Sequence, residues 1–79
     1  MARVLLFGSL ADLAGWRDRD IDAPAVSVLK AMLDREDEDL GAALMAPGVQ
    51  VAVDQEIQRQ DWPLTPSSEV AFLPPMSGG

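Results

Sequence analysis

The chain has 79 residues, the size of one small domain. It contains neither cysteine nor histidine, which excludes disulfides, thiol nucleophiles and the common zinc-binding sets. Thirteen acidic and six basic residues give a net charge of −7, which disfavours nucleic acid and anionic membranes as partners. The charge favours basic protein surfaces or serves only solubility. With no membrane-length apolar run and no signal-like start, we expect a cytoplasmic protein.

The first predicted strand runs from Arg3 to Phe7. Its apolar residues alternate, with Val4 and Leu6 on one face and Leu5 and Phe7 on the other. Because both faces are apolar, we expect a central strand, covered by a helix on one face and by something else on the second.

The next two elements are predicted to be a short helix and an edge strand. We expect Ser9 to cap a short helix over Leu10–Ala14, which Gly15 ends. The next segment, Trp16–Asp22, places five charged residues around Ile21. That pattern is typical of an exposed edge strand with one residue in the core.

The main helix is predicted over roughly Val26–Arg35. Val26, Leu29 and Leu33 repeat with helical spacing and form its core stripe. Ala25, at the expected N-cap, has no side-chain oxygen, and this weakens the helix start by typically about 1 kcal/mol.

Four consecutive acidic residues, 36–39, precede a second predicted helix over Leu40–Met45. We interpret them as favourable negative charges at a helix start. A metal site is the alternative, but the ligand spacing and glycine turn of a calcium loop are absent, so we predict no metal.

A hairpin and a loop complete the domain. The hairpin consists of a strand over Val49–Val53, a turn at Asp54-Gln55 and a short strand over Glu56–Gln58. In the loop that follows, Leu64 is the expected core residue. The last strand is Val70–Leu73, and the order of elements indicates an α+β fold with a mixed sheet.

The C-terminal segment combines three features. Val70–Leu73 is a short apolar strand, and Pro74 and Pro75 then end it and stiffen the exit. Gly78 and Gly79 have no side chains, so this backbone fits a channel that any Cβ atom would block. Such an end delivers its carboxylate to the active site of another protein. A frayed end is the alternative, but the pair of prolines favours the functional interpretation.

The final run Val-Ala-Phe-Leu-Pro-Pro-Met-Ser-Gly-Gly resembles the C-terminus of the MoaD family, the sulfur-carrier small subunits of molybdopterin synthase. Nearly the whole chain fits that pattern, although only the terminal motif is specific. The resemblance implies a ubiquitin-like β-grasp domain over residues 1–73, with a mixed sheet packed on one main helix. An arm over residues 74–79 follows. Relatives carry Gly-Asp-Glu where this chain has Ser67-Ser68-Glu69, so a turn needing positive φ would be strained or of another type.

The resemblance also implies a mechanism. An E1-like (MoeB-like) enzyme uses ATP to adenylate Gly79, and sulfur displaces AMP to leave a thiocarboxylate. Within a heterotetramer, the large (MoaE-like) subunit then takes this sulfur for the dithiolene of molybdopterin. The small subunit itself binds no cofactor and supplies no catalytic side chain.

Site residues follow from the resemblance. Gly79 carries the chemistry and Gly78 provides clearance. We expect Phe7, Ile57 and Leu73 to form an exposed apolar patch beside the root of the arm. The full set expected to bind partners is Phe7, Ile57, Phe72, Leu73, Pro74, Pro75 and Met76.

Three other functions stay open. One is a ubiquitin-like modifier, joined through Gly79 to lysines of other proteins. A second is the sulfur carrier of thiamine or cysteine biosynthesis, although the Phe-x-Pro-Pro run from Phe72 to Pro75 favours the molybdopterin branch. The third is a purely structural subunit, for which the glycine tip is incidental.

Overall fold

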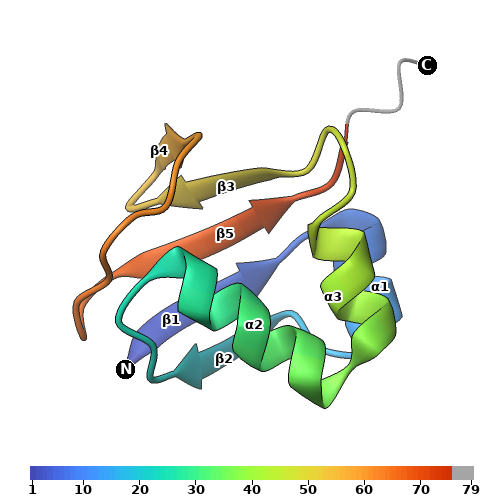
Figure 1. The fold of residues 1–79 in the computed structure, drawn as a ribbon, viewed down its shortest axis with the longest axis horizontal. Coiled ribbons are helices and arrows are strands. Elements are labelled where there is room, and N and C mark those ends of the chain that lie inside the picture. Colours follow the sequence, from blue (N-terminus) through green and yellow to red (C-terminus); the bar gives the residue numbers. More distant parts are fainter. Residues whose placement is uncertain (76–79) are drawn as a thin grey trace.

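The computed structural model describes residues 1–75, and the expected residues Met76, Gly78 and Gly79 lie outside this range. Figure 1 shows the elements in chain order along these residues. They are β1 (Ala2–Leu6), α1 (Gly8–Ala14), β2 (Asp18–Ile21), α2 (Val26–Glu36), α3 (Glu38–Leu44), β3 (Gln50–Val53), β4 (Glu56–Gln58) and β5 (Glu69–Leu73). No helix in this part of the chain is long and apolar enough to cross a membrane.

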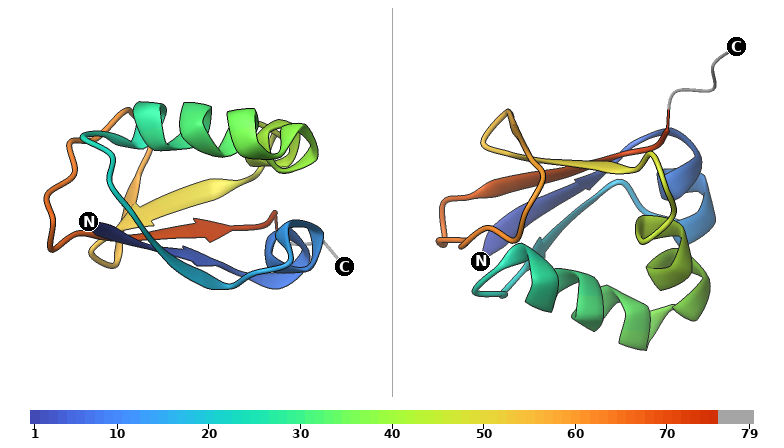
Figure 2. Two further views of the ribbon diagram at one scale, coloured as in Figure 1. Left: turned by 90° about the horizontal axis from the view of Figure 1, so that it is seen from below. Right: turned by 45° about the horizontal axis from the view of Figure 1, so that its top comes forward.

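The strands form one sheet in the order β2-β1-β5-β3-β4. β1 and β5 pair in parallel at its centre, and the other neighbours are antiparallel. Figure 2 shows α2 and α3 against one face of the sheet, with α1 beside the end at which β5 exits. The predicted α+β class, mixed sheet and pairing of the two end strands are therefore confirmed.

The start of α1 differs from the prediction. The helix begins at Gly8 rather than Leu10, and Phe7 is its N-cap without a capping side-chain bond. Ser9 lies inside the first turn, so its predicted capping role is wrong. The reason is that strand pairing continues to the cap, because the Phe7 N–H donates to the Phe72 carbonyl at 3.3 Å. The chain turns directly from the sheet into the helix.

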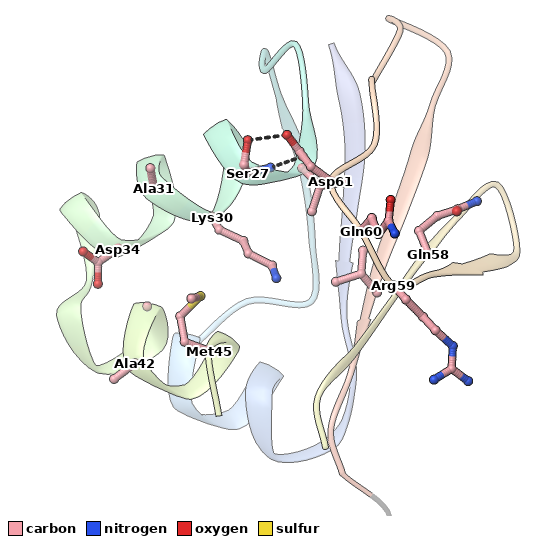
Figure 3. Close-up of a pocket in the computed structure, with 13 residues that line it drawn as sticks. Ser27, Lys30, Ala31, Asp34, Ala42, Met45, Gln58, Arg59, Gln60 and Asp61 are labelled. Atoms are coloured by element: carbon pink, nitrogen blue, oxygen red, sulfur yellow. Dashed lines mark hydrogen bonds between the residues drawn. The ribbon is translucent and has the colours of Figure 1, made fainter. Parts of the chain in front are cut away.

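The first turn of α2 is hydrogen-bonded to a carboxylate that is distant in the sequence. Ala25 makes no capping bond, as expected, but Asp61 in the loop after β4 accepts hydrogen bonds from the Ser27 N–H at 2.8 Å and the Ser27 hydroxyl at 2.7 Å (Figure 3). The Val26 N–H donates to the Trp62 carbonyl at 3.0 Å. The weak start predicted from Ala25 is thus compensated by residues distant in the sequence.

The acidic run before α3 also has an observed structural role. Asp37 is the N-cap and accepts bonds from the N–H groups of Asp39 and Leu40 at 3.1 and 3.2 Å. Glu36 pairs with Arg19 of β2 at 3.2 Å. The interpretation of these acids as a helix start is confirmed.

Two turns make hydrogen bonds at the start of β5. At the β3–β4 turn, Asp54 and Gln55 both have positive φ, at 50° and 71°, and the Asp54 carboxylate accepts from the Glu69 N–H at 2.9 Å. Before β5, the buried Ser68 hydroxyl accepts from the Thr65 N–H at 2.8 Å. No residue from 67 to 69 has positive φ, so this turn is of another type rather than strained.

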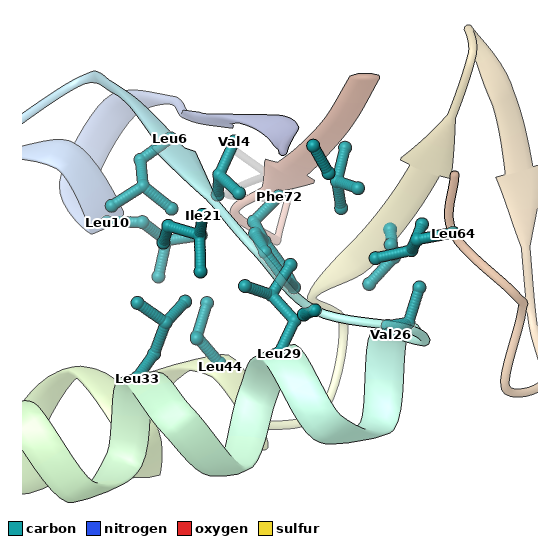
Figure 4. Packing of buried hydrophobic residues seen from close by; sticks show 14 of the residues in the cluster. Val4, Leu6, Leu10, Ile21, Val26, Leu29, Leu33, Leu44, Leu64 and Phe72 are labelled. Atoms are coloured by element: carbon teal, nitrogen blue, oxygen red, sulfur yellow. The ribbon is translucent and has the colours of Figure 1, made fainter. Parts of the chain in front are cut away.

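The core fills the space between the sheet and the helices (Figure 4). Leu29 and Leu33 of α2 are fully buried, as their helical spacing predicted, and Leu64 closes one end of the core. The core residues from the sheet are Ala2, Val4, Leu6, Ile21, Val51, Val53, Val70 and Phe72. On the second face of β1, which was expected to be covered by something other than a helix, Leu5 is half-buried and Phe7 is exposed.

Candidate functional site

The helix-free face of the sheet carries a continuous apolar surface. Strand pairing places Leu5 opposite Ala71, Ala71 opposite Ala52, and Ala52 opposite Ile57. Paired residues share a face, so this row crosses four strands. We call the set Leu5, Phe7, Ala52, Ile57, Ala71 and Leu73 the open face.

Phe7 and Leu73 extend the open face to the root of the arm. Phe7 follows β1 with extended backbone angles, φ −119° and ψ 152°, so alternation places it on the same face as Leu5. Phe7 is 44% exposed and Ile57 is 43% exposed, Leu5, Ala71 and Leu73 are half-buried, and Ala52 between them is buried. An exposed apolar surface of this kind marks a site of protein association.

Charged residues border the open face along β2. Asp18 is paired opposite Leu5, and Asp20 opposite Arg3. The Arg3 guanidinium donates hydrogen bonds to the Asp18 carboxylate, with Nε at 3.1 Å from Oδ1. This bond lowers the pKa of Asp18 and raises the pKa of Arg3. The border therefore presents acidic groups beside an apolar centre.

The arm leaves the sheet where three segments meet. β5 ends at Leu73, Pro74 is half-buried and Pro75 is exposed. In Figure 1 this exit lies close to α1 and to the turn between α3 and β3. The root of the arm is thus adjacent to the Phe7 and Leu73 end of the open face.

A groove of about 520 Å³ lies on the other side of the molecule, between α2, α3 and the loop after β4 (Figure 3). Lys30 points into it from α2, and Met45 at the C-cap of α3 and Asp61 of the loop also line it. The Ser27 hydrogen bonds lower the pKa of Asp61, helped by the Trp62 N–H and the charge of Lys30. These polar contacts hold the start of α2. With no histidine in the chain, a Ser-His-Asp arrangement cannot form around Ser27.

Within residues 1–75, no three carboxylate side chains lie close enough together to hold an ion.

The family assignment rests on the length of the match. The model of the ThiS family matches residues 4–79. The chain belongs to the ThiS family. One relative, the molybdopterin synthase sulfur carrier subunit of Escherichia coli (strain K12), is 33% identical over 81 aligned residues, with all of both chains covered. The resemblance given by the terminal motif is confirmed.

Solved structures agree with the ThiS-family fold. The small archaeal modifier protein 1 of Methanosarcina acetivorans superimposes with a TM-score of 0.88 at 20% identity, covering 99% of this chain and 95% of that one. The modifier protein SAMP1 of Haloferax volcanii gives 0.80 at 24% identity, covering 99% and 98%. At these identities the likeness supports the ubiquitin-like fold alone.

The expected site residues of this ThiS-family chain fall into four groups, one of which is the pair Pro74 and Pro75 at the root of the arm. Phe7, Ile57 and Leu73 lie on the open face, and none of them is buried. Phe72 is 0% exposed, so its predicted contact with a partner needs correction: its side chain fills the core. The reason is alternation, which turns Phe72 inward and Leu73 outward. Met76, Gly78 and Gly79 lie outside the described residues.

Sequence reasoning missed part of the open face. Leu5, Ala52 and Ala71 link Phe7 and Leu73 to Ile57, but their role depends on the pairing register. The alternation along each strand predicts on which face a single residue lies. It did not say which outward residues become neighbours across the sheet.

Proposed function

We propose that this protein is a sulfur carrier whose reactive group is the carboxylate of Gly79. The supporting observation is the 33% identity to a sulfur carrier subunit over the full length of both chains. The ThiS-family match also continues to residue 79. The open face, which ends at the root of the arm, suits a protein that docks on a partner while its tail enters that partner.

The chemistry requires an activated carboxyl group. A Gly79 oxygen attacks the α-phosphorus of ATP, pyrophosphate leaves, and an acyl-adenylate forms. A hydrosulfide equivalent then attacks the carbonyl carbon, its proton is released, and AMP leaves, giving the thiocarboxylate. The thiocarboxylate sulfur then attacks an acceptor carbon and displaces a leaving group, which gives a thioester. Water attacks the carbonyl carbon of that thioester, the C–S bond breaks, and the carboxylate is restored while the sulfur stays on the acceptor as a thiol.

Other proteins supply the machinery for these steps. A ubiquitin-E1-like (MoeB-like) activating enzyme binds the ATP, so this chain needs no cofactor of its own. A larger (MoaE-like) subunit then takes the sulfur for the dithiolene of molybdopterin, in a heterotetramer with two copies of the carrier. The name of the Escherichia coli relative supports this pathway over the other sulfur-carrier pathways.

The open face is the docking surface in this proposal. Its apolar centre loses contact with water when a partner covers it, which stabilises the complex. Asp18 is already paired with Arg3, so Asp20 is the border carboxylate that favours partners with a basic group at the matching position. The side chains provide the docking, while the C-terminal carboxylate provides the chemistry.

The experiment follows the mass of the protein. Incubation with its activating enzyme, ATP and a sulfur donor is expected to give the mass gain of one oxygen-to-sulfur exchange, located at Gly79. Addition of the large synthase subunit and the pterin precursor is expected to reverse that gain. Isopeptide-linked conjugates as the main product, without a sulfur-bearing form, would contradict the proposal and identify a protein modifier.

A further inference from the structure

Each proline at the root of the arm packs against a glycine from a different part of the chain. Pro74 faces Gly8, the first residue of α1, and a Cβ atom built on Gly8 would lie 3.1 Å from Cγ of Pro74. Pro75 faces Gly48 in the turn between α3 and β3, and a Cβ atom built there would lie 2.8 Å from Cβ of Pro75. The second approach is closer than any real Cβ atom tolerates without movement of its neighbour.

The two glycines also have backbone angles that favour glycine. Gly8 has φ of 55° and Gly48 has φ of 89°. An L-residue in this region costs about 1 kcal/mol or more. Both the backbone angle and the approaching proline ring therefore select glycine at these two positions.

These contacts matter because strand pairing stops at the same point. The Phe7 N–H donates to the Phe72 carbonyl at 3.3 Å, and Pro74 and Pro75 have no N–H with which to extend the sheet. The fixed φ of each proline and its contact with glycine then determine the direction in which the chain leaves β5.

The direction set at the root limits where the end of the chain can reach, because the four residues after Pro75 span at most about 14 Å. A misplacement of about 1 Å at a reacting group lowers a rate by up to about 100-fold.

We propose that Gly8 and Gly48 are positioning residues for the reaction at Gly79. They seat Pro74 and Pro75 and thereby aim the arm, without contacting any reacting atom. The inference rests on the proposed function, because it concerns the delivery of the same carboxylate.

Gly15 provides a matched control. It has φ of 83°, close to the 89° of Gly48, and is also exposed, but no atom lies within 4 Å of a Cβ atom built on it. Gly15→Ala and Gly48→Ala are therefore expected to have similar backbone strain, whereas only Gly48→Ala displaces a proline.

The test compares thiocarboxylate formation by the wild type, Gly15→Ala and Gly48→Ala with the same activating enzyme, ATP and sulfur donor. We expect kcat to fall at least about tenfold in Gly48→Ala and to stay at the wild-type value in Gly15→Ala. KM is expected to change little, since the open face is intact. The kcat of Gly8→Ala, whose new methyl group makes a milder contact, is expected to lie between the values of these two variants. Gly8→Ala decides the test if Gly48→Ala does not fold.

A double-mutant comparison separates steric displacement from other effects. In a Pro75→Gly background the ring that meets the new methyl group is absent, so adding Gly48→Ala is expected to cause no further loss of kcat. Equal kcat values for Gly48→Ala, Gly8→Ala and Gly15→Ala would overturn the positioning role while leaving the carrier function intact. A wild-type protein that never gains sulfur would instead overturn the proposed function, and this inference with it.

Discussion

Alternate residues of β5 meet two different environments. Val70 and Phe72 point towards the helices and are fully buried, whereas Ala71 and Leu73 are half-buried on the open face. One strand thus contributes to the stability of the domain with one side and to a docking surface with the other. The comparison teaches that apolar character alone does not identify a binding residue. What matters is which face the alternation assigns to it.

The largest effect is expected on the buried side of β5. Phe72→Ala removes a fully buried ring and leaves a cavity, which lowers the free energy of unfolding by about 3–5 kcal/mol. A small domain has little stability in reserve, so a large fraction of the variant is expected to unfold near physiological temperature. Denaturant unfolding measures this loss. A loss of sulfur transfer with stability unchanged would instead place Phe72 in the docking surface.

The open face is expected to respond in the opposite way. Ile57→Asp places a charge in its apolar centre and is expected to weaken binding to the large subunit by about 10- to 100-fold, with stability nearly unchanged. Titration calorimetry measures the binding. Val28→Asp is the matched control, because Val28 on α2 is 40% exposed against 43% for Ile57. Equal losses from both variants would contradict docking through the open face.

Acid is expected to weaken the helix-covered side through Asp61. Its folded-state pKa is lowered, chiefly by the Ser27 hydroxyl, so its contribution to stability is complete above its unfolded pKa and is lost as the pH falls through the folded value. Asp61→Ala is therefore expected to be less stable than the wild type at neutral pH. This difference in stability is expected to disappear at low pH. Thermal unfolding from pH 7 to pH 2 measures it. A gap that does not depend on pH would exclude the carboxylate as its cause.

The smallest effect is expected at the β3–β4 turn, away from both faces. Gln55 has φ of 71°, which glycine adopts without strain. Because glycine also loses more conformational freedom on folding, Gln55→Gly is expected to stabilise the domain by only about 0.5 kcal/mol. Chemical denaturation measures the change, and binding to the large subunit serves as the control. A clear destabilisation would show that the Gln55 side chain supports the turn.

Local sequence patterns predicted most of the elements. The period of Leu29 and Leu33 identified the core side of α2, and the alternation of Val4 and Leu6 identified the inner side of β1. These predictions succeeded because each depends on residues close together in the chain. The pairing of the two end strands came from the family resemblance, since parallel pairing of distant segments leaves no local signal.

The errors and omissions share one physical cause. Asp61 replaces the missing cap of α2 from 34 residues away from Ser27, so neither residue indicates the contact by itself. Gly8 and Gly48 are turn signals in the sequence, but their contacts with the prolines exist only in the folded chain. Alternation along β5 separates Phe72 from Leu73, but only the packing of the folded chain shows which of the two faces the helices.

The central claim is that the carrier docks through the open face beside the root of its arm. Amide chemical-shift mapping of the labelled protein during addition of the large synthase subunit tests it most directly. The account predicts the strongest perturbations at Leu5, Phe7, Ile57, Ala71 and Leu73, with the outer surface of α2 unchanged. Perturbations concentrated on α2 and the groove around Lys30, with the open face unaffected, would contradict it.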